Sequence, residues 1–144
     1  MNRDEAVTLA EDLLAEFGLS SWQVRFERKI TRLGACRYVD RVILLSRPLV
    51  DVNERALIED TIRHEIAHAM LPPEAAHGPQ WEAQCAITGA RPVAGYYRDE
   101  ITMPPAPWVL RCQHGCESPR YRRPTSVWRC RRHGATMRGV QNAQ

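Results

Sequence analysis

The stretch that most constrains this chain is His64-Glu65-Ile66-Ala67-His68. On an α-helix, residues four apart are separated by about 400° of rotation and therefore lie on the same side. The two imidazoles can then bind one Zn²⁺, and Glu65, about 100° further round, can reach a water molecule on that metal. This spacing is the zinc metalloprotease pattern H-E-x-x-H. The alternative is a helix with two exposed histidines and a solvated glutamate. The surrounding sequence has to distinguish a zinc site from such a helix.

The sequence around this motif predicts the helix that it needs. Asp51-Val52-Asn53-Glu54 is typical of a capping box, with an acid first and a glutamate three residues later. We expect a helix from there to about Met70, and Pro72-Pro73 ends it because proline cannot continue a helix. The buried stripe of that helix is expected to contain the apolar residues at helical spacing, which are Leu57, Ile58, Ile62, Ile66 and Ala69.

A zinc ion on two histidines needs a third protein ligand and keeps its fourth position for water. We expect His77 to be that ligand, because it follows the helix break closely and the chain can turn back on the metal. Pro79 suits the first turn of the next helix, which we expect over residues 79–87. Glu74 and Glu82 are the alternative ligands.

The oxyanion that forms when water attacks a carbonyl needs a hydrogen-bond donor or a positive charge beside it. The segment Tyr96-Tyr97-Arg98, which follows the second helix, offers both kinds of group. We therefore expect the oxyanion partner in this segment, with Tyr96 and Tyr97 as the candidates.

The residues before the motif predict a scaffold of one helix and a small sheet. Residues 4–17 have apolar side chains at helical spacing, and Gly18 is suited to end that helix. Residues 22–46 change to strand spacing and predict an antiparallel sheet of about three strands, with turns at Leu33-Gly34 and Asp40-Arg41.

A proline-rich stretch, Met103-Pro104-Pro105-Ala106-Pro107, is typical of a stiff linker. A chain of 144 residues suits one main domain with a small appendage. The expected organisation is therefore a metal-binding domain, a linker, a second module and a disordered tail, at residues 1–103, 104–110, 111–135 and 136–144.

Two pairs of metal-binding residues follow the linker. They are Cys112 with Cys116, and Cys130 with His133, and 13 residues separate the pairs. This spacing predicts a tetrahedral structural zinc site of the Cys₃His type, with His114 as a competing ligand. A module this short could scarcely fold without its metal.

The second module is strongly basic. Residues 111–144 hold eight arginines and one acid, a net charge of +7, whereas residues 1–110 hold 12 basic and 16 acidic residues, a net charge of −4. A basic module of this kind suits a polyanion. Arginines interleaved with aromatic residues are typical of phosphate contacts and base stacking on single-stranded nucleic acid. The expected contact residues are Arg120, Tyr121, Arg122, Arg123, Trp128 and Arg129.

The sequence offers no sign of a membrane span or a signal peptide. No run approaches the ~20 apolar residues of a span, and the N-terminus lacks the apolar core of a signal peptide. We therefore expect a cytoplasmic monomer without a membrane partner. In that compartment cysteines stay reduced, which favours metal binding over disulfides for clustered cysteines.

The chain resembles the SprT-like family of zinc metalloproteases over about residues 4–134. The residues that carry the resemblance are His64-Glu65-x-x-His68, His77-Gly78-Pro79-x-Trp81 and the ribbon-like set Cys112, Cys116, Cys130 and His133. The resemblance implies that His64, His68 and His77 bind a catalytic zinc ion. It also implies that Glu65 is the general base and that the ribbon binds DNA.

These observations together predict an α+β fold with a small zinc-ribbon module. The predicted function is a zinc-dependent endopeptidase that acts on DNA-associated proteins, as in DNA–protein crosslink repair, with one catalytic and one structural Zn²⁺. Its expected partners are a protein substrate and single-stranded DNA. Two alternatives stay open: a non-catalytic zinc-ribbon protein that binds nucleic acid, and a zinc peptidase that acts on a free protein target.

Overall fold

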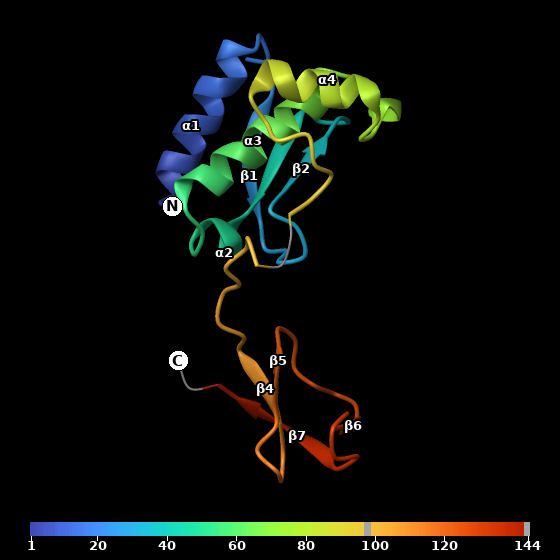
Figure 1. Ribbon diagram of the computed structural model, residues 1–144. Coiled ribbons are helices and arrows are strands. Elements are labelled where there is room, and N and C mark those ends of the chain that lie inside the picture. The colour runs from blue at the N-terminus through green and yellow to red at the C-terminus, as the bar shows by residue number, and fades with distance from the viewer. Residues whose placement is uncertain (97–98, 143–144) are drawn as a thin grey trace. The chain divides into compact units, whose positions relative to one another are not determined.

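The structure, a computed structural model, describes residues 1–96 and 99–142 and has two compact units (Figure 1). The first unit is Met1–Pro104 and the second is Pro105–Gln144. The division falls within the proline-rich stretch. The predicted linker, 104–110, is too long, because the first strand of the second unit begins at Trp108.

The fold is α+β, as the sequence predicts. The helices of the first unit are α1 (Arg3–Glu16), α2 (Arg47–Val50), α3 (Arg55–Ala69) and α4 (Pro79–Thr88), with a 3₁₀ turn, η1 (Pro73–Ala75). Its strands are β1 (Gln23–Glu27), β2 (Gly34–Arg37) and β3 (Val42–Ser46). In the described parts of the chain, every helix is too short or too polar to cross a membrane.

The sheet of the first unit has the order β1-β3-β2 and is mixed, so the prediction of an antiparallel sheet is wrong for one strand pair. β2 and β3 are antiparallel, whereas β1 is parallel to β3. The reason is the burial of β3, whose five residues are all buried. A strand that is apolar on both faces takes the central position, which leaves β1 and β2 on opposite sides of it.

The expected turn at Leu33-Gly34 is also wrong, because Gly34 is the first residue of β2. α3 passes so close to this strand that a Cβ atom on Gly34 would lie 2.7 Å from Thr61 Cγ2. The glycine therefore serves close packing of a strand against a helix.

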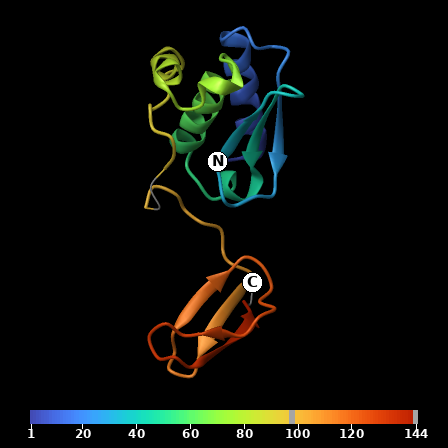
Figure 2. The ribbon, with the colours of Figure 1, turned by 90° about the vertical axis from the view of Figure 1, so that its right-hand side faces the viewer.

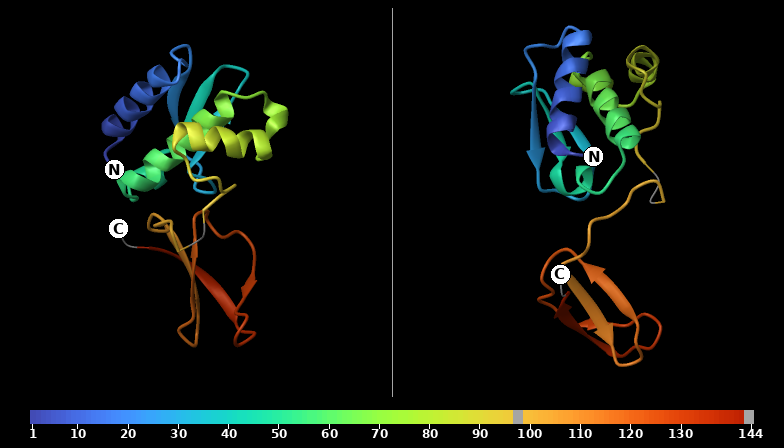
Figure 3. Two further views of the ribbon diagram at one scale, coloured as in Figure 1. Left: turned by 45° about the horizontal axis from the view of Figure 1, so that its top comes forward. Right: turned by 90° about the vertical axis from the view of Figure 1, so that its left-hand side faces the viewer.

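The first unit is layered. α1 and α3 lie along one face of the sheet, and α4 lies on the side of α3 away from the sheet (Figures 2 and 3). Apolar side chains between the sheet and the two inner helices form the main core, including Ala10, Leu14, Ile43, Leu45, Ile58, Ile62 and Ile66. A smaller cluster joins α3 to α4 and contains Ala67, Trp81, Cys85 and Ala90.

The predicted capping box before α3 is wrong, because tertiary contacts engage its side chains. Asp51 forms an ion pair with Arg3 at 2.5 Å. Asn53 is buried, and its amide donates to the carbonyl oxygens of Leu49 and Thr102. Glu54 is the N-cap residue but makes no side-chain capping bond.

The second unit is an antiparallel sheet in the order β5-β4-β7-β6. Its strands are β4 (Trp108–Cys112), β5 (Glu117–Arg120), β6 (Trp128–Arg129) and β7 (Thr136–Gln141). The prediction of a disordered tail over 136–144 is wrong for residues 136–141, which form β7. This strand is ordered because it pairs with both β4 and β6.

Candidate metal centres

Three histidines of the first unit bring their ring nitrogens together. His77 Nε2 lies 3.0 Å from His68 Nε2 and 3.2 Å from His64 Nε2. A tetrahedral zinc ion with bonds of 2.0–2.1 Å holds its nitrogen ligands roughly 3.3 Å apart. The three nitrogens therefore have nearly the separation that one zinc ion requires, and a fourth position is left for water or substrate.

The segment that follows the end of α3 brings His77 back to that helix. η1 and a tight turn follow α3, in which Gly78 N–H donates to Ala75 O at 2.9 Å. Ala76 has a φ of 43°, which is uncommon for a residue with a side chain. Pro79 then begins α4. Strained backbone of this kind concentrates at functional sites.

Trp81 lies against all three imidazoles. Its ring centroid is 4.8 Å from that of His64, 5.3 Å from that of His68 and 4.6 Å from that of His77. The side chain is 1% exposed. The indole therefore restricts the orientation of each ring, and a ligand set that is held in advance binds metal with less loss of entropy.

Burial prepares two of the histidines for metal binding. Burial, and then the neighbouring imidazoles of His68 and His77, lower the pKa of His64 to about 4. Burial and the imidazole of His77 lower the pKa of His68 to about 4 as well. Both rings are therefore neutral at pH 7, which is the form that coordinates a metal.

Glu65 is buried beside the histidines. Burial raises the pKa of Glu65 to about 7, against the opposing effects of Arg32 and of the backbone N–H of Cys36, which bonds its carboxylate. A carboxylate with a pKa near the working pH is suited to accept and return a proton. The β2 strand confines this side chain, because a Cβ atom on Gly34 would lie 2.9 Å from Glu65 Oε1.

A pocket of about 290 Å³ opens beside His64 and Glu65. Its walls come from the segment that leads into β2, from α3 and from the segment after α4. The lining residues are Thr31, Arg32, Leu33, Gly34, Thr61, His64, Glu65, Ala94, Gly95, Tyr96 and Ile101.

Tyr96, one of the two oxyanion candidates, lines this pocket with its hydroxyl engaged. The hydroxyl donates to Asp60 Oδ2 at 2.9 Å and accepts from Thr61 Oγ1 at 3.1 Å. These bonds attach the segment after α4 to α3. The other candidate, Tyr97, and the neighbouring Arg98 lie outside the described residues.

Sequence reasoning missed two residues that shape this centre. Tyr38 donates from its hydroxyl to the backbone oxygen of His68 at 3.0 Å, and Gly34 admits α3 to the strand. Neither has a local signal, because each acts on a residue far away in the chain. The alternative ligands Glu74 and Glu82 are not part of the three-histidine group among the residues that the structure describes.

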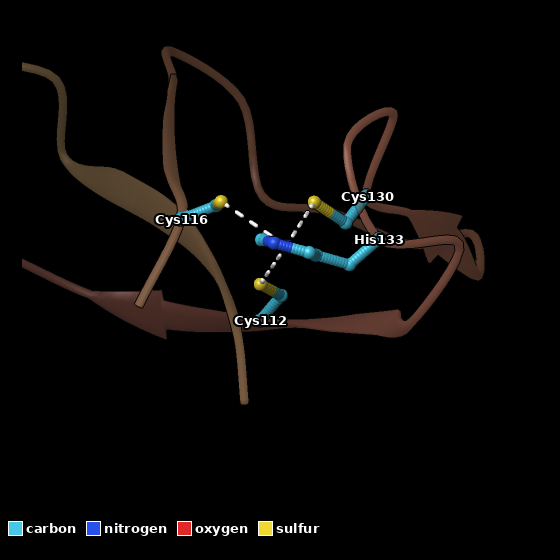
Figure 4. A group of neighbouring side chains, drawn as sticks. All are labelled: Cys112, Cys116, Cys130 and His133. Atoms are coloured by element: carbon cyan, nitrogen blue, oxygen red, sulfur yellow. Dashed lines mark hydrogen bonds between the residues drawn. The ribbon is translucent and has the colours of Figure 1, made fainter. Parts of the chain in front are cut away.

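The second unit brings together the other predicted ligand set (Figure 4). His133 Nδ1 lies 3.9 Å from Cys112 Sγ, 3.5 Å from Cys116 Sγ and 3.7 Å from Cys130 Sγ. A tetrahedral zinc ion with bonds of 2.3 Å to sulfur and 2.0–2.1 Å to nitrogen places these atoms roughly 3.6 Å apart. Four donors fill the coordination sphere, so this set suits a structural ion.

Two similar turns hold the four ligands. Gly115 N–H donates to Cys112 O at 3.0 Å in one, and Gly134 N–H donates to Cys130 O at 2.8 Å in the other. Both glycines have φ between 65° and 80°, where a side chain would be strained. Although burial opposes it, the backbone N–H groups of His133 and Arg132 lower the pKa of the Cys130 thiol to about 6.

His114, the competing ligand, lies outside this group among the described residues and packs on the ring of His133 with 4.4 Å between centroids.

Both donor sets fit zinc: three imidazoles with an open position in the first unit, and three thiols with an imidazole in the second.

Four of the predicted nucleic-acid residues, Arg120, Arg123, Trp128 and Arg129, make contacts within the second unit. Arg120 Cζ lies 4.3 Å from the ring centroid of Trp128, and Arg123 Cζ lies 5.7 Å from that of Trp108. Arg129 donates to Gly134 O at 3.2 Å. Tyr121 is half-buried and Arg122 is exposed.

A comparison with known families matches the first unit. The model of the SprT-like family covers residues 5–100. This span contains the three-histidine centre with Glu65 and ends before the Cys₃His centre. No match is found among curated proteins or solved structures. Because the family match covers more than half of the 144 residues, the chain belongs to the SprT-like family, which is of the metalloprotease type.

Proposed function

Starting from its membership of the SprT-like family, we propose that this protein is a zinc-dependent endopeptidase that acts on DNA-associated proteins. The observation that carries the proposal is the convergence of three histidine nitrogens within hydrogen-bond distance, next to the buried carboxylate of Glu65. A purely structural metal site would have no use for a buried base beside an open coordination position.

In this proposal His64, His68 and His77 hold the zinc ion. When bound, zinc polarises the scissile carbonyl and lowers the pKa of its water. Glu65 accepts the proton of that water and returns it to the leaving amine. Its raised pKa, near 7, suits both transfers.

The position of β2 at the edge of the sheet is an argument for a peptide substrate. β2 is at one end of the strand order, and Ser46 N–H donates to Leu33 O across the pair with β3. Because the pairing alternates along the strand, the backbone groups of Gly34 and Cys36 face away from β3, and of these the N–H of Cys36 already bonds the Glu65 carboxylate. An extended peptide can add to such an edge by backbone hydrogen bonds, and the pocket beside Glu65 can take one of its side chains.

The positive charge of the second unit is an argument that the enzyme binds DNA and meets its substrates there. Its eight arginines face one acid over residues 111–144, and the family domain itself has no such excess. A protease tethered to DNA meets DNA-bound proteins at a high effective concentration.

The test is Glu65→Gln in the full chain, with cleavage measured on a DNA-bound protein and metal measured by mass spectrometry. We expect cleavage to fall by about 10²–10⁴-fold while two zinc ions stay bound per chain. The matched control is Glu82→Gln, an exposed carboxylate on α4, which should cleave like the unmodified protein. Unchanged cleavage by Glu65→Gln would show that the base is assigned wrongly.

Added DNA separates the remaining possibilities. Cleavage that rises with DNA and falls with salt supports the DNA-tethered enzyme, because phosphate contacts are salt-sensitive. Cleavage that is indifferent to both would instead identify a peptidase for a free protein target. Zinc binding by the second unit alone, without any cleavage, would identify a non-catalytic binding protein.

A further inference from the structure

The sheet of the second unit has two faces of different character. Side chains alternate along a strand, so the strand register assigns each residue to one face. On one face Trp108 lies opposite Arg120, and Leu110 lies opposite Gly139. Residues 121–127 fold over this face, because a Cβ atom on Gly139 would lie 3.0 Å from Pro124 Cγ. We call it the covered face.

The tryptophan rings of the covered face each have an arginine side chain packed over them. The guanidinium of Arg120 lies over the ring of Trp128 and also donates to Ser118 Oγ and Pro119 O, at 2.8 Å each. Arg123 lies over Trp108 in the same way. In both pairs the guanidinium lies over the indole ring, so that side of each ring is occupied by the chain itself.

The opposite face, which we call the open face, consists of residues that alternate with those of the covered face. Its members are Val109, Arg111, Glu117, Pro119, Arg129, Thr136, Arg138 and Val140. Val109 is buried, and the other seven residues are exposed. None of these residues is aromatic.

Three arginines of the open face are neighbours. Arg111 on β4 lies directly opposite Arg138 on β7, and Arg129 on β6 lies opposite Thr136, which places it diagonally next to Arg138. Like charges directly opposite one another destabilise a sheet. The arrangement therefore brings no benefit to folding, and a bound polyanion would relieve the repulsion.

One acid faces the three arginines. Glu117 pairs with Arg111 at 2.6 Å across β4 and β5. Among the residues described in the structure, no acid forms an ion pair with Arg129 or Arg138. The excess positive charge is thus concentrated on β7 and β6.

We propose that the open face binds the phosphate backbone of DNA through Arg111, Arg129 and Arg138, without reading its bases. This inference rests on the proposed function, in which the second unit holds the enzyme on DNA. The sequence-based prediction combined phosphate contacts with base stacking and named a different set, of which only Arg129 is shared: Arg120, Tyr121, Arg122, Arg123, Trp128 and Arg129. Arginine binds phosphate through its planar fork of donors, and contacts to phosphate carry no base specificity.

The test measures binding of the full chain to a fluorescent oligonucleotide by anisotropy at several salt concentrations. Arg111→Gln and Arg138→Gln should each weaken binding and reduce the slope of log Kd against log[salt] by about 0.7–0.9, as expected for one lost phosphate contact. The matched control is Arg122→Gln, which removes the same charge from the exposed covering segment and should leave the slope unchanged. Zinc content confirms that each variant is folded.

A second variant is expected to gain affinity. Glu117→Gln removes the acid that competes for Arg111, so it should tighten binding and increase the slope by about the same amount. Equal losses in all arginine variants, or a loss only in Arg122→Gln, would overturn the open face as the binding surface while leaving DNA tethering intact. A full chain that does not bind DNA at all would overturn both this inference and the DNA part of the proposed function, while proteolysis could still stand.

Discussion

The two metal centres are built on opposite principles. Two of the three histidines of the first centre lie on α3, whose other side is packed into a core of buried apolar residues from α1 and β3. The Cys₃His centre joins two turns of a sheet whose buried apolar side chains are few, chiefly Val109 and Leu110. The first centre has three donors, and the second has four.

This difference indicates what a metal ion would do at each site. The first unit buries enough apolar surface to fold around an empty ligand set, so a bound ion there would be free to serve chemistry. The second unit is about 40 residues long, a size at which a metal or disulfide is usually needed for stability. A metal ion bound by its four ligands would therefore substitute for a core.

The sharpest way to break this comparison is to remove the second ion. Cys130→Ser should unfold the second unit, because structural zinc contributes about 10–16 kcal/mol to the folding of small zinc modules. The first unit should persist. Backbone amide NMR signals report the loss of the sheet, and circular dichroism at 222 nm reports the helices, which belong to the first unit.

The control for that variant is His114→Ala, which removes a histidine outside the four-ligand group and should keep the second unit folded. If the helices of the first unit were lost in Cys130→Ser, the two units would not be independent, and the comparison would fail.

The next largest effect is expected at Trp81. Trp81→Ala removes a fully buried ring from between α3 and α4 and should reduce the free energy of unfolding of the first unit by about 3–5 kcal/mol. It should also weaken metal binding to the three histidines that the ring contacts, whereas Trp81→Phe should do so less. Urea unfolding followed at 222 nm, with zinc titration, measures both.

Ile87→Ala offers the matched control on the same helix, since its side chain is 63% exposed and its loss should change stability by less than about 0.5 kcal/mol. Full metal affinity in Trp81→Ala would mean that the histidines are held by other contacts.

A smaller effect is expected where β2 meets α3. Gly34→Ala introduces a methyl group 2.7 Å from Thr61 Cγ2 and 2.9 Å from Glu65 Oε1. Overpacking of this kind should destabilise the first unit by about 1–3 kcal/mol and lower cleavage by displacing Glu65. Gly95→Ala is the control, because a Cβ atom there meets nothing within 4 Å. Equal behaviour of the two variants would contradict the close contact.

The smallest effect is expected at Tyr96. Tyr96→Phe removes hydrogen bonds to Asp60 and Thr61 and should reduce the free energy of unfolding by about 1 kcal/mol, with kcat nearly unchanged. Steady-state cleavage and urea unfolding test this together. A large fall in kcat without loss of stability would instead assign the oxyanion role to the Tyr96 hydroxyl.

The sequence alone predicted those parts of the site that depend on local spacing. His64 and His68 share a helix face because of the helical repeat, and Cys112, Cys116, Cys130 and His133 lie in short turns whose spacing already implies a common ion. His77 was found because a proline break makes the chain reverse close to the motif.

What only the tertiary structure decided are the pairings between distant segments. β1 lies parallel to β3 because a strand buried on both faces must be central, and residues 136–141 form β7 because β4 and β6 both need a partner. The shared face of Trp108 and Trp128 and the row of open-face arginines depend on strand register, which no local pattern records. Local spacing thus determined the ligands of this protein, and long-range packing decided what surrounds them, because burial and strand pairing depend on residues far apart in the chain.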